Sequence, residues 1–214
     1  ALQGASTVLL AVQPQQIVAL VDEIRDDIDP TRHKVISVVS SVTVAQLREM
    51  IPAPTQVVRA MPNTAVSIGE SMTCLAADPD SADALDEAEA LFKGVGLTIR
   101  IEDEMMVGAT ALCACGIAFF LRSVRAASQG GIEIGFHPED ALLLAAQTAR
   151  GAASLVLRDD HHPESEIDRV TTPRGCTIAG LNEMEHQGFS SAMIKGFVLS
   201  AQKAALLFDD GDVA

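Results

Sequence analysis

Aromatic side chains are scarce in this 214-residue sequence, which has no tryptophan, no tyrosine and seven phenylalanines. Its core must therefore be built from small and aliphatic side chains. Hydrophobic residues make up 48% of the chain, so it is globular rather than disordered, and its length suits one large or two small domains. The lack of tyrosine also argues against dehydrogenases that use a tyrosine–lysine pair as the acid.

Basic residues are few as well. The chain has 15 lysines and arginines against 29 aspartates and glutamates, which gives a formal net charge of −14. Such a surface repels phosphate backbones and anionic lipids, so we expect no nucleic-acid partner and no membrane. The four cysteines do not form a framework of the secreted type, and the first residues lack the pattern of a secretory signal. We therefore expect a cytoplasmic location.

Metal-binding patterns are weak. The only clusters are Cys113-x-Cys115 and His161-His162. Side chains two apart on a helix diverge, and neither cluster has a partner pair at zinc-finger spacing, so we predict no metal site. The run Asp159-Asp160-His161-His162 is instead expected to cap an exposed helix end. A cysteine nucleophile with a histidine base has no local support either.

The first hundred residues alternate between strand and helix patterns. Apolar runs predict strands at residues 6–12, 33–39, 55–60, 72–76 and 97–101, and helical spacing predicts helices at 14–27, 43–50 (capped by Thr43) and 81–93. This alternation predicts an α/β fold with a mainly parallel, Rossmann-like sheet. The first strand is apolar throughout, so we expect it to be buried on both faces.

After residue 104 the pattern becomes all-α. Helices are expected at residues 105–128, 138–157, 178–186 and 189–208. Residues 105–121 carry no charge but are rich in glycine, alanine and cysteine, which favours a buried or intersubunit helix over a membrane span. The 138–157 helix is apolar on nearly every side and is expected to pack against a second copy of the chain. We therefore predict two domains, 1–103 and 104–214.

The stretch VTTPRGCTIAG (residues 170–180) places hydroxyls and a glycine before a helix start. The unpaired N–H groups of such a start suit an anion. Four further stretches precede it in order, namely LAVQP (10–14), RAMPNT (59–64), GATALCACGIAFF (108–120) and GFHPEDALLLAAQT (135–148). Together the five resemble the pyrroline-5-carboxylate reductase family over essentially the whole chain.

This resemblance implies an enzyme that reduces the small imino acid 1-pyrroline-5-carboxylate to proline with NADPH or NADH, the last step of proline biosynthesis. It implies a dinucleotide-binding domain followed by a helical substrate-binding and dimerisation domain. The protein would be a homo-oligomer, a dimer and possibly a decamer. The family's glycine-rich pyrophosphate turn and the residues that select the cofactor are absent from this chain, so domain 1–103 is partial. We expect the missing part to precede Ala1 in the complete protein.

The resemblance also assigns site residues. In the family, the loop that matches residues 172–177 holds the substrate carboxylate, which implies roles for Thr172, Arg174, Gly175, Cys176 and Thr177. Thr177 is expected to be the chief polar contact, with a catalytic consequence, because a misplaced imine reacts slowly. Arg174 replaces a family glycine and either adds a bond to the substrate or fills its space. A plain helix cap without a ligand is the competing interpretation.

Cofactor contacts follow in the same way. Ala11, Val12, Gln13 and Pro14 match the strand end beside the nicotinamide ribose, where the family usually has lysine at the position of Gln13. Val38 and Ser40 belong to a turn, residues 38–41, that is Ala-Ala-Gly in the family. Asn63 lies in the 61–64 loop expected below the nicotinamide ring. Polar residues are common in strand-end loops in any case.

Some departures keep other functions open. The family's Ser-Gly-Ser-Gly-Pro run is here Cys-Ala-Cys-Gly-Ile at residues 113–117. A related imine or keto reductase with another substrate would explain Gln13, Arg174 and the altered turn at 39–41. A non-catalytic fragment that serves assembly alone is the third possibility. The sequence does not choose between NADPH and NADH.

Overall fold

The computed structural model describes residues 2–159 and 162–209. Its five-stranded sheet has the order β1-β2-β3-β4-β5, with β1 (Thr7–Leu10), β2 (Lys34–Ser37), β3 (Gln56–Met61), β4 (Ser71–Ala77) and β5 (Gly96–Arg100). The pairs β1–β2, β2–β3 and β4–β5 are parallel, and β3–β4 is antiparallel. The mainly parallel sheet is thus confirmed. The antiparallel pair arises because the 62–70 connection is too short for a crossover.

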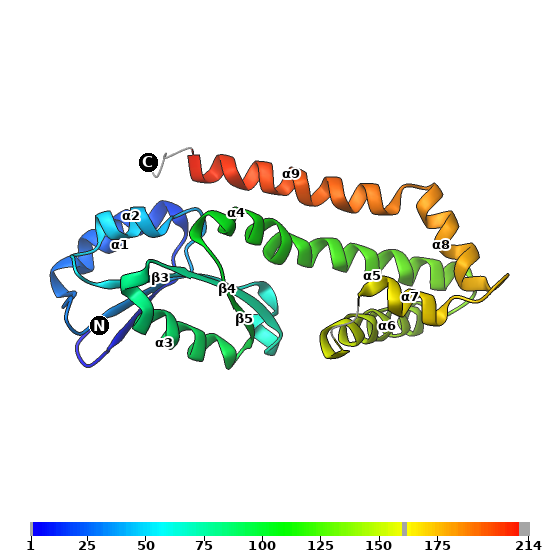
Figure 1. Ribbon diagram of the computed structural model, residues 1–214, viewed down its shortest axis with the longest axis horizontal. Coiled ribbons are helices and arrows are strands. Elements are labelled where there is room, and N and C mark those ends of the chain that lie inside the picture. Colours follow the sequence, from blue (N-terminus) through cyan, green and yellow to red (C-terminus); the bar gives the residue numbers. More distant parts are fainter. Residues whose placement is uncertain (1, 160–161, 210–214) are drawn as a thin grey trace. The chain divides into compact units, whose positions relative to one another are not determined.

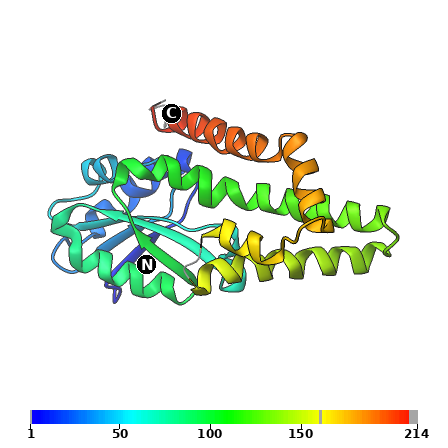
Figure 2. The same cartoon turned by 45° about the vertical axis from the view of Figure 1, so that its right-hand side comes forward.

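Helices cover both faces of this sheet (Figures 1 and 2). On one face lie α1 (Ile17–Ile24), flanked by the 3₁₀ turns η1 (Pro14–Gln16) and η2 (Arg25–Asp27), and α2 (Val44–Met50). Their buried Ile17, Val21 and Leu47 pack with residues of β1, β2 and β3. On the other face, α3 (Ala82–Lys93) packs through Ala84, Ala88 and Phe92.

The predicted cap of α2 is confirmed. Thr43 Oγ1 accepts a hydrogen bond from the Gln46 backbone N at 3.1 Å, and the Gln46 side chain accepts one from the Thr43 backbone N at 2.9 Å. This reciprocal pair satisfies two backbone N–H groups at the helix start. It fixes where the turn after β2 ends and α2 begins.

The expectation that the first strand is buried on both faces is wrong for this chain. Val8 and Leu10 are buried, but Leu9 is 49% exposed. The reason is that β1 lies at one end of the described sheet, while α3 packs on β2 to β5. Thr7 Oγ1 donates a hydrogen bond to Glu87 of α3, which also pairs with Lys34 of β2.

The rest of the chain is helical, as expected. The 3₁₀ turn η5 (Asp103–Met105), α4 (Met106–Ala109), the π-helix η6 (Thr110–Cys115) and α5 (Gly116–Glu133) follow one another directly. They are followed by α6 (Pro138–Asp159), α7 (Pro163–Val170), α8 (Cys176–His186) and α9 (Phe189–Asp209). The 105–128 helix therefore extends five residues further, to Glu133, and contains an unpredicted π segment.

Helix α7 was not expected, because its sequence PESEIDRV is mostly polar. Its start carries clear signals nonetheless. His162 is its N-cap and accepts from the Glu164 backbone N at 3.3 Å, and Pro163 opens the helix. Of the run 159–162, which was expected to cap a helix end, His162 caps the start of α7. Asp160 and His161 lie outside the described residues.

The chain divides into two compact units. The first takes in the described residues up to Ile117 and from Phe197 onward, and the second is Ala118–Gly196. The predicted boundary at 103/104 stays a prediction. Within the second unit, α5 and α6 approach closely at Gly131, where an added Cβ would lie 3.0 Å from the Ala141 Cβ.

One helical stretch, Asp103–Glu133, is long and apolar enough to cross a membrane by length and composition alone. Only 22% of its most apolar window is buried. Burial inside the chain therefore does not account for its apolar character. The intersubunit interpretation stays a prediction.

Candidate active site

Three loops of the first unit lie at one edge of the sheet. They follow β1, β2 and β3 as residues 11–14, 38–41 and 62–64. Because these strands are neighbours and parallel, their carboxyl ends meet at the same edge, and the Val38 backbone N donates to the Leu10 carbonyl at 2.9 Å. Ligands of open α/β sheets bind at this edge.

The predicted cofactor residues are brought together there. Ala11, Gln13 and Ser40 are exposed, while Val12, Pro14, Val38 and Asn63 are half-buried. Ala11 and Ser40, which follow two neighbouring strand ends, are thus open to solvent at this edge. Their role in holding a cofactor stays a prediction.

The turn after β2 contains a strained residue. Ser41 has φ +64°, a left-handed conformation that is easy for glycine and costly for other residues. The glycine that the family has at this position is thus explained by the backbone. Here serine adopts the same conformation, so the shape of the turn is kept at a cost in strain.

Asn63 holds the third loop in place. Its Oδ1 accepts from the Ala65 backbone N at 3.0 Å and caps the 3₁₀ turn η3 (Thr64–Ile68). Its Nδ2 donates to the Cys113 carbonyl of η6 at 3.3 Å, and its backbone N donates to Ser71 Oγ at 3.2 Å. The loop is therefore tied to both β4 and the π-helix.

The predicted carboxylate loop lies in the second unit, where it opens α8. Gly175 is the N-cap residue, and because it has no side chain this helix start has no side-chain cap from its N-cap residue. The Gly175 backbone N donates to the Thr172 carbonyl at 2.9 Å, and a Cβ on Gly175 would lie 2.4 Å from Thr172 Oγ1. A larger residue at position 175 would require Thr172 to move.

The five predicted substrate residues share this one turn. Thr172, Arg174 and Cys176 are exposed, and Gly175 and Thr177 are half-buried. Arg174 has φ +61°, which again explains the glycine of the family. A helix start without a side-chain cap from its N-cap residue, with two hydroxyls beside it, can bind a carboxylate.

A buried ion pair near the sheet edge was missed by sequence reasoning. The Arg59 side chain is 1% exposed, and its Nη1 donates to Asp103 Oδ1 at 2.9 Å. Asp103 Oδ2 also accepts from the Val44 backbone N at 3.0 Å. Burial lowers the pKa of Arg59, while Asp103 opposes that shift. An arginine inside an otherwise apolar strand was the available signal.

A thiol pair was missed as well. Cys74 Sγ of β4 lies 3.9 Å from Cys113 Sγ of η6. No local pattern indicates this pair, because the two cysteines lie 39 positions apart in the sequence. All four cysteines are free thiols, and no cluster of three or more metal-ligating side chains occurs among residues 2–159 and 162–209.

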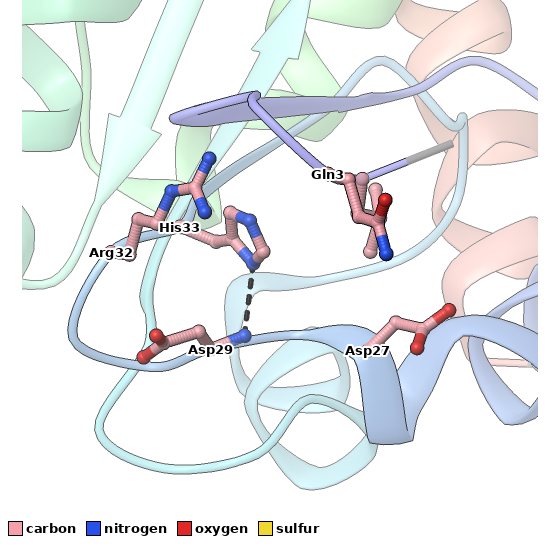
Figure 3. A pocket seen from close by; sticks show the side chains of 6 residues that line it. Gln3, Asp27, Asp29, Arg32 and His33 are labelled. Atoms are coloured by element: carbon pink, nitrogen blue, oxygen red, sulfur yellow. Dashed lines mark hydrogen bonds between the residues drawn. The ribbon is translucent and has the colours of Figure 1, made fainter.

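A separate hollow of about 200 Å³ lies at the amino end of β2 (Figure 3). It is lined by Leu2, Gln3, Asp27, Asp29, Arg32 and His33. His33 Nδ1 accepts from the Asp29 backbone N at 2.9 Å, and His33 Nε2 has no hydrogen-bond partner within the described part of the chain. No predicted site residue lines this hollow, which lies at the other end of the strand from the three loops.

Comparison with known proteins agrees with these features. Residues 103–207 match the family model described as pyrroline-5-carboxylate reductase dimerisation. The chain is 50% identical over 220 residues to pyrroline-5-carboxylate reductase 1 of Dictyostelium discoideum, covering 97% of this chain and 40% of that protein. It is 49% identical over 212 residues to pyrroline-5-carboxylate reductase 2 of the same organism, covering 92% and 71%.

Solved structures agree on the fold. A pyrroline-5-carboxylate reductase from Coxiella burnetii matches with a TM-score of 0.90 and 29% identity, over 96% of this chain and 77% of that one. A pyrroline carboxylate reductase from Plasmodium falciparum with NADP bound matches with a TM-score of 0.85 and 21% identity, over 95% and 78%. The chain thus spans between 40% and 78% of the length of these four proteins.

Proposed function

The chain belongs to the pyrroline-5-carboxylate reductase family, and we propose that the complete protein reduces 1-pyrroline-5-carboxylate to proline, the last step of proline biosynthesis. The observation that carries this proposal is the turn at Thr172–Thr177, where a helix start without a side-chain cap lies beside two hydroxyls. The substrate is inferred from the names of the similar proteins, and the turn offers a binding place for its carboxylate.

In this proposal the substrate carboxylate accepts hydrogen bonds from the first turn of α8 and from the hydroxyls of Thr172 and Thr177. Gly175 keeps the backbone close, and Arg174 adds a positive charge at the rim. A bound nicotinamide supplies the hydride, and the imine takes its proton from solvent beforehand. The protein's part is to orient the ring and exclude water, which needs no strong acid or base.

The cofactor is proposed to be NADPH or NADH, held at its nicotinamide end by the loops of Ala11–Pro14, Val38–Ser41 and Asn63. An NADP-bound neighbour supports the cofactor class. We further propose a homo-oligomer assembled through the helical part, a dimer and possibly a decamer, which the dimerisation model supports. A cytoplasmic location, without membrane or nucleic-acid partners, completes the proposal.

The test is oxidation of NADPH and of NADH by the complete protein, followed near the reduced-nicotinamide band at about 340 nm with pyrroline-5-carboxylate. Thr177→Ala removes one hydrogen bond to a charged group, worth roughly 1.5–3 kcal/mol, so kcat/KM should fall about 10- to 150-fold.

Thr171→Ala is the matched control, because Thr171 Oγ1 already donates to the Ile167 carbonyl at 2.7 Å. It should leave kcat/KM near that of the native protein. A Thr177→Ala enzyme as active as the native one would remove this turn from the site. Activity only with another imine or a keto acid would favour the related reductase, and no activity with any of them would favour a role in assembly alone.

A further inference from the structure

The Cys74–Cys113 pair joins two elements of the first unit. Cys74 lies on β4, is 3% exposed and sits opposite Met61 in the β3–β4 ladder. Cys113 lies in the π-helix η6 and is half-buried. The two sulfur atoms are 3.9 Å apart, within hydrogen-bond distance for sulfur. Apart from this contact, their surroundings are the apolar cluster of Met61, Ala76, Met106 and Ala109.

The pair lies directly behind a loop of the proposed cofactor site. Asn63, which caps η3 and fixes the 62–64 loop, donates its Nδ2 to the carbonyl of Cys113 itself. A movement of the Cys113 backbone would therefore be transmitted to Asn63. Short π segments often occur at functional sites, and η6 contains Cys113 near its end.

The two thiols are not equivalent. The hydrogen bond between the two thiols lowers the pKa of Cys113 to about 7, against the effect of burial. The same contact, together with burial, raises the pKa of Cys74. Cys113 is also the more accessible of the two, so it is the thiol that an oxidant reaches first, while Cys74 is buried next to it.

We propose that Cys113 and Cys74 are a reversible oxidation site, in which a hydroperoxide oxidises Cys113 and Cys74 then closes a disulfide that shifts the 62–64 loop. The Cys113 thiolate attacks a peroxide oxygen, the O–O bond breaks, and a sulfenic acid and hydroxide result. Cys74 then attacks that sulfur, the S–O bond breaks, and a disulfide and water form. The two thiols lose two electrons to the peroxide, and a dithiol reductant restores them.

Closing this bond must bring the two sulfur atoms together. A disulfide requires about 2.05 Å between the sulfur atoms, so they must approach by roughly 2 Å. β4 is held in the sheet on both sides, by β3 and β5, so η6 is the element that gives way. Because the Cys113 carbonyl accepts from Asn63 Nδ2, we expect a shift of η6 to alter this hydrogen bond and to loosen the loop under the proposed nicotinamide position.

The chemical part is tested on the complete protein without any assay of activity. After treatment with hydrogen peroxide and alkylation, mass spectrometry of the digested protein should show the Cys74 and Cys113 peptides linked, with neither cysteine alkylated and a mass about 2 Da below that of the two unalkylated peptides together. Cys115→Ser should form the same bond. Cys74→Ser should stop at a sulfenic acid on Cys113 that dimedone traps, and Cys113→Ser should leave Cys74 unoxidised. A disulfide between other cysteines, or none, would overturn the proposal.

The effect on catalysis rests on the proposed function. Oxidation should raise the KM for NADPH or NADH at least about threefold in the native protein and in Cys115→Ser, with full recovery in dithiothreitol. Cys74→Ser and Cys113→Ser should not respond by this amount. A disulfide without any change in KM would overturn the loop movement. A Cys74–Cys113 disulfide in a protein with no reductase activity would overturn the proposed function and leave the oxidation site standing.

Discussion

The two units treat their apolar side chains differently. The first buries them in three clusters, one between β1–β3 and helices α1 and α2, one under α3, and one between β3, β4 and α4. In the second unit, the described residues classed as buried are Ser128 and Ala141. Its helices instead expose large side chains, among them Phe120, Leu121, Ile132, Leu142, Leu143, Leu157 and Ile194.

This difference indicates that the second unit, unlike the first, needs a partner surface to cover its apolar side chains. The first has its own core, while the second leaves many large apolar side chains exposed. Helix α6 alone exposes three consecutive leucines, Leu142–Leu144, between 48% and 69%. A second copy of the chain is the simplest cover, because closed symmetric assemblies are the common form of soluble oligomers. The comparison thus supports the proposed homo-oligomer.

The ion pairs of the two units also differ in the elements that they connect. In the first unit most of them join separate segments, as in Arg48 with Asp78 and Asp80, or Arg59 with Asp103, although Lys93 and Glu89 pair within α3. In the second unit the pair Arg169–Glu166 lies within a single helix, α7. Charges therefore hold the first unit's elements together, and the largest predicted effect concerns the most buried of these pairs.

Asp103→Ala should destabilise the first unit by about 3 kcal/mol, because it takes a carboxylate away from a buried guanidinium and an acceptor away from the Val44 backbone N. Urea unfolding at one protein concentration measures the loss. Glu104→Ala, an exposed neighbour, should change the free energy of unfolding by less than about 0.5 kcal/mol. Equal stability of the two variants would mean that the ion pair contributes little.

Leu143→Glu should act on assembly rather than on the first unit. It puts a charge into the apolar surface of α6, where Leu143 is 69% exposed. We expect the dissociation constant of the oligomer to rise about thirtyfold, roughly 2 kcal/mol, as measured by sedimentation. Leu97→Glu on β5, at a side chain that is 58% exposed, is the control and should assemble normally. If the two variants dissociate alike, the contrast between the units fails.

Arg174→Gly should separate a role in binding from backbone strain. If Arg174 donates to the substrate carboxylate, KM should rise about tenfold, roughly 1.5 kcal/mol. Stability should at the same time increase slightly, by about 0.5 kcal/mol, because glycine accepts the φ of +61°. Ser41→Gly gives the same relief at φ +64° in the other unit, so the KM for the imino acid should stay unchanged. A lower KM in Arg174→Gly would show that the arginine fills substrate space.

Much of this fold could be predicted because local patterns decide it. Apolar runs that alternate with helical patterns located all five strands, and Thr43 located the start of α2. Contacts between distant segments carry no such local signal, so the Arg59–Asp103 and Cys74–Cys113 pairs were missed. The exposed side of β1 was missed for the same reason, since the apolar run does not say which strand ends the sheet.

The site divides along similar lines. The turn at 172–177 is local, and the structure brings its predicted residues together. The cofactor residues lie in three separate loops, and parallel pairing of β1–β3 is what gathers them. The strain at Ser41 and Arg174 could be inferred only from the glycines of the family, because nothing in a single serine or arginine announces a positive φ.

The smallest predicted effect is on the stability of the first unit at low pH. Glu89 of α3 pairs with Arg100 of β5 and with Lys93, and these bonds, Arg100 first, lower its pKa from 4.5 to about 2. A carboxyl whose folded pKa is depressed stabilises the fold above its unfolded pKa, and this contribution is lost as pH falls from about 4.5 towards 2. Glu89→Gln should therefore lose less stability than the native protein as the pH falls. The difference should be small, because solvent screens the pair. Urea midpoints at pH 5, 4 and 3, beside Glu23→Gln on α1, measure this. If the stability of Glu89→Gln falls with pH as steeply as that of the native protein, the Glu89–Arg100 pair between α3 and β5 does not stabilise the first unit.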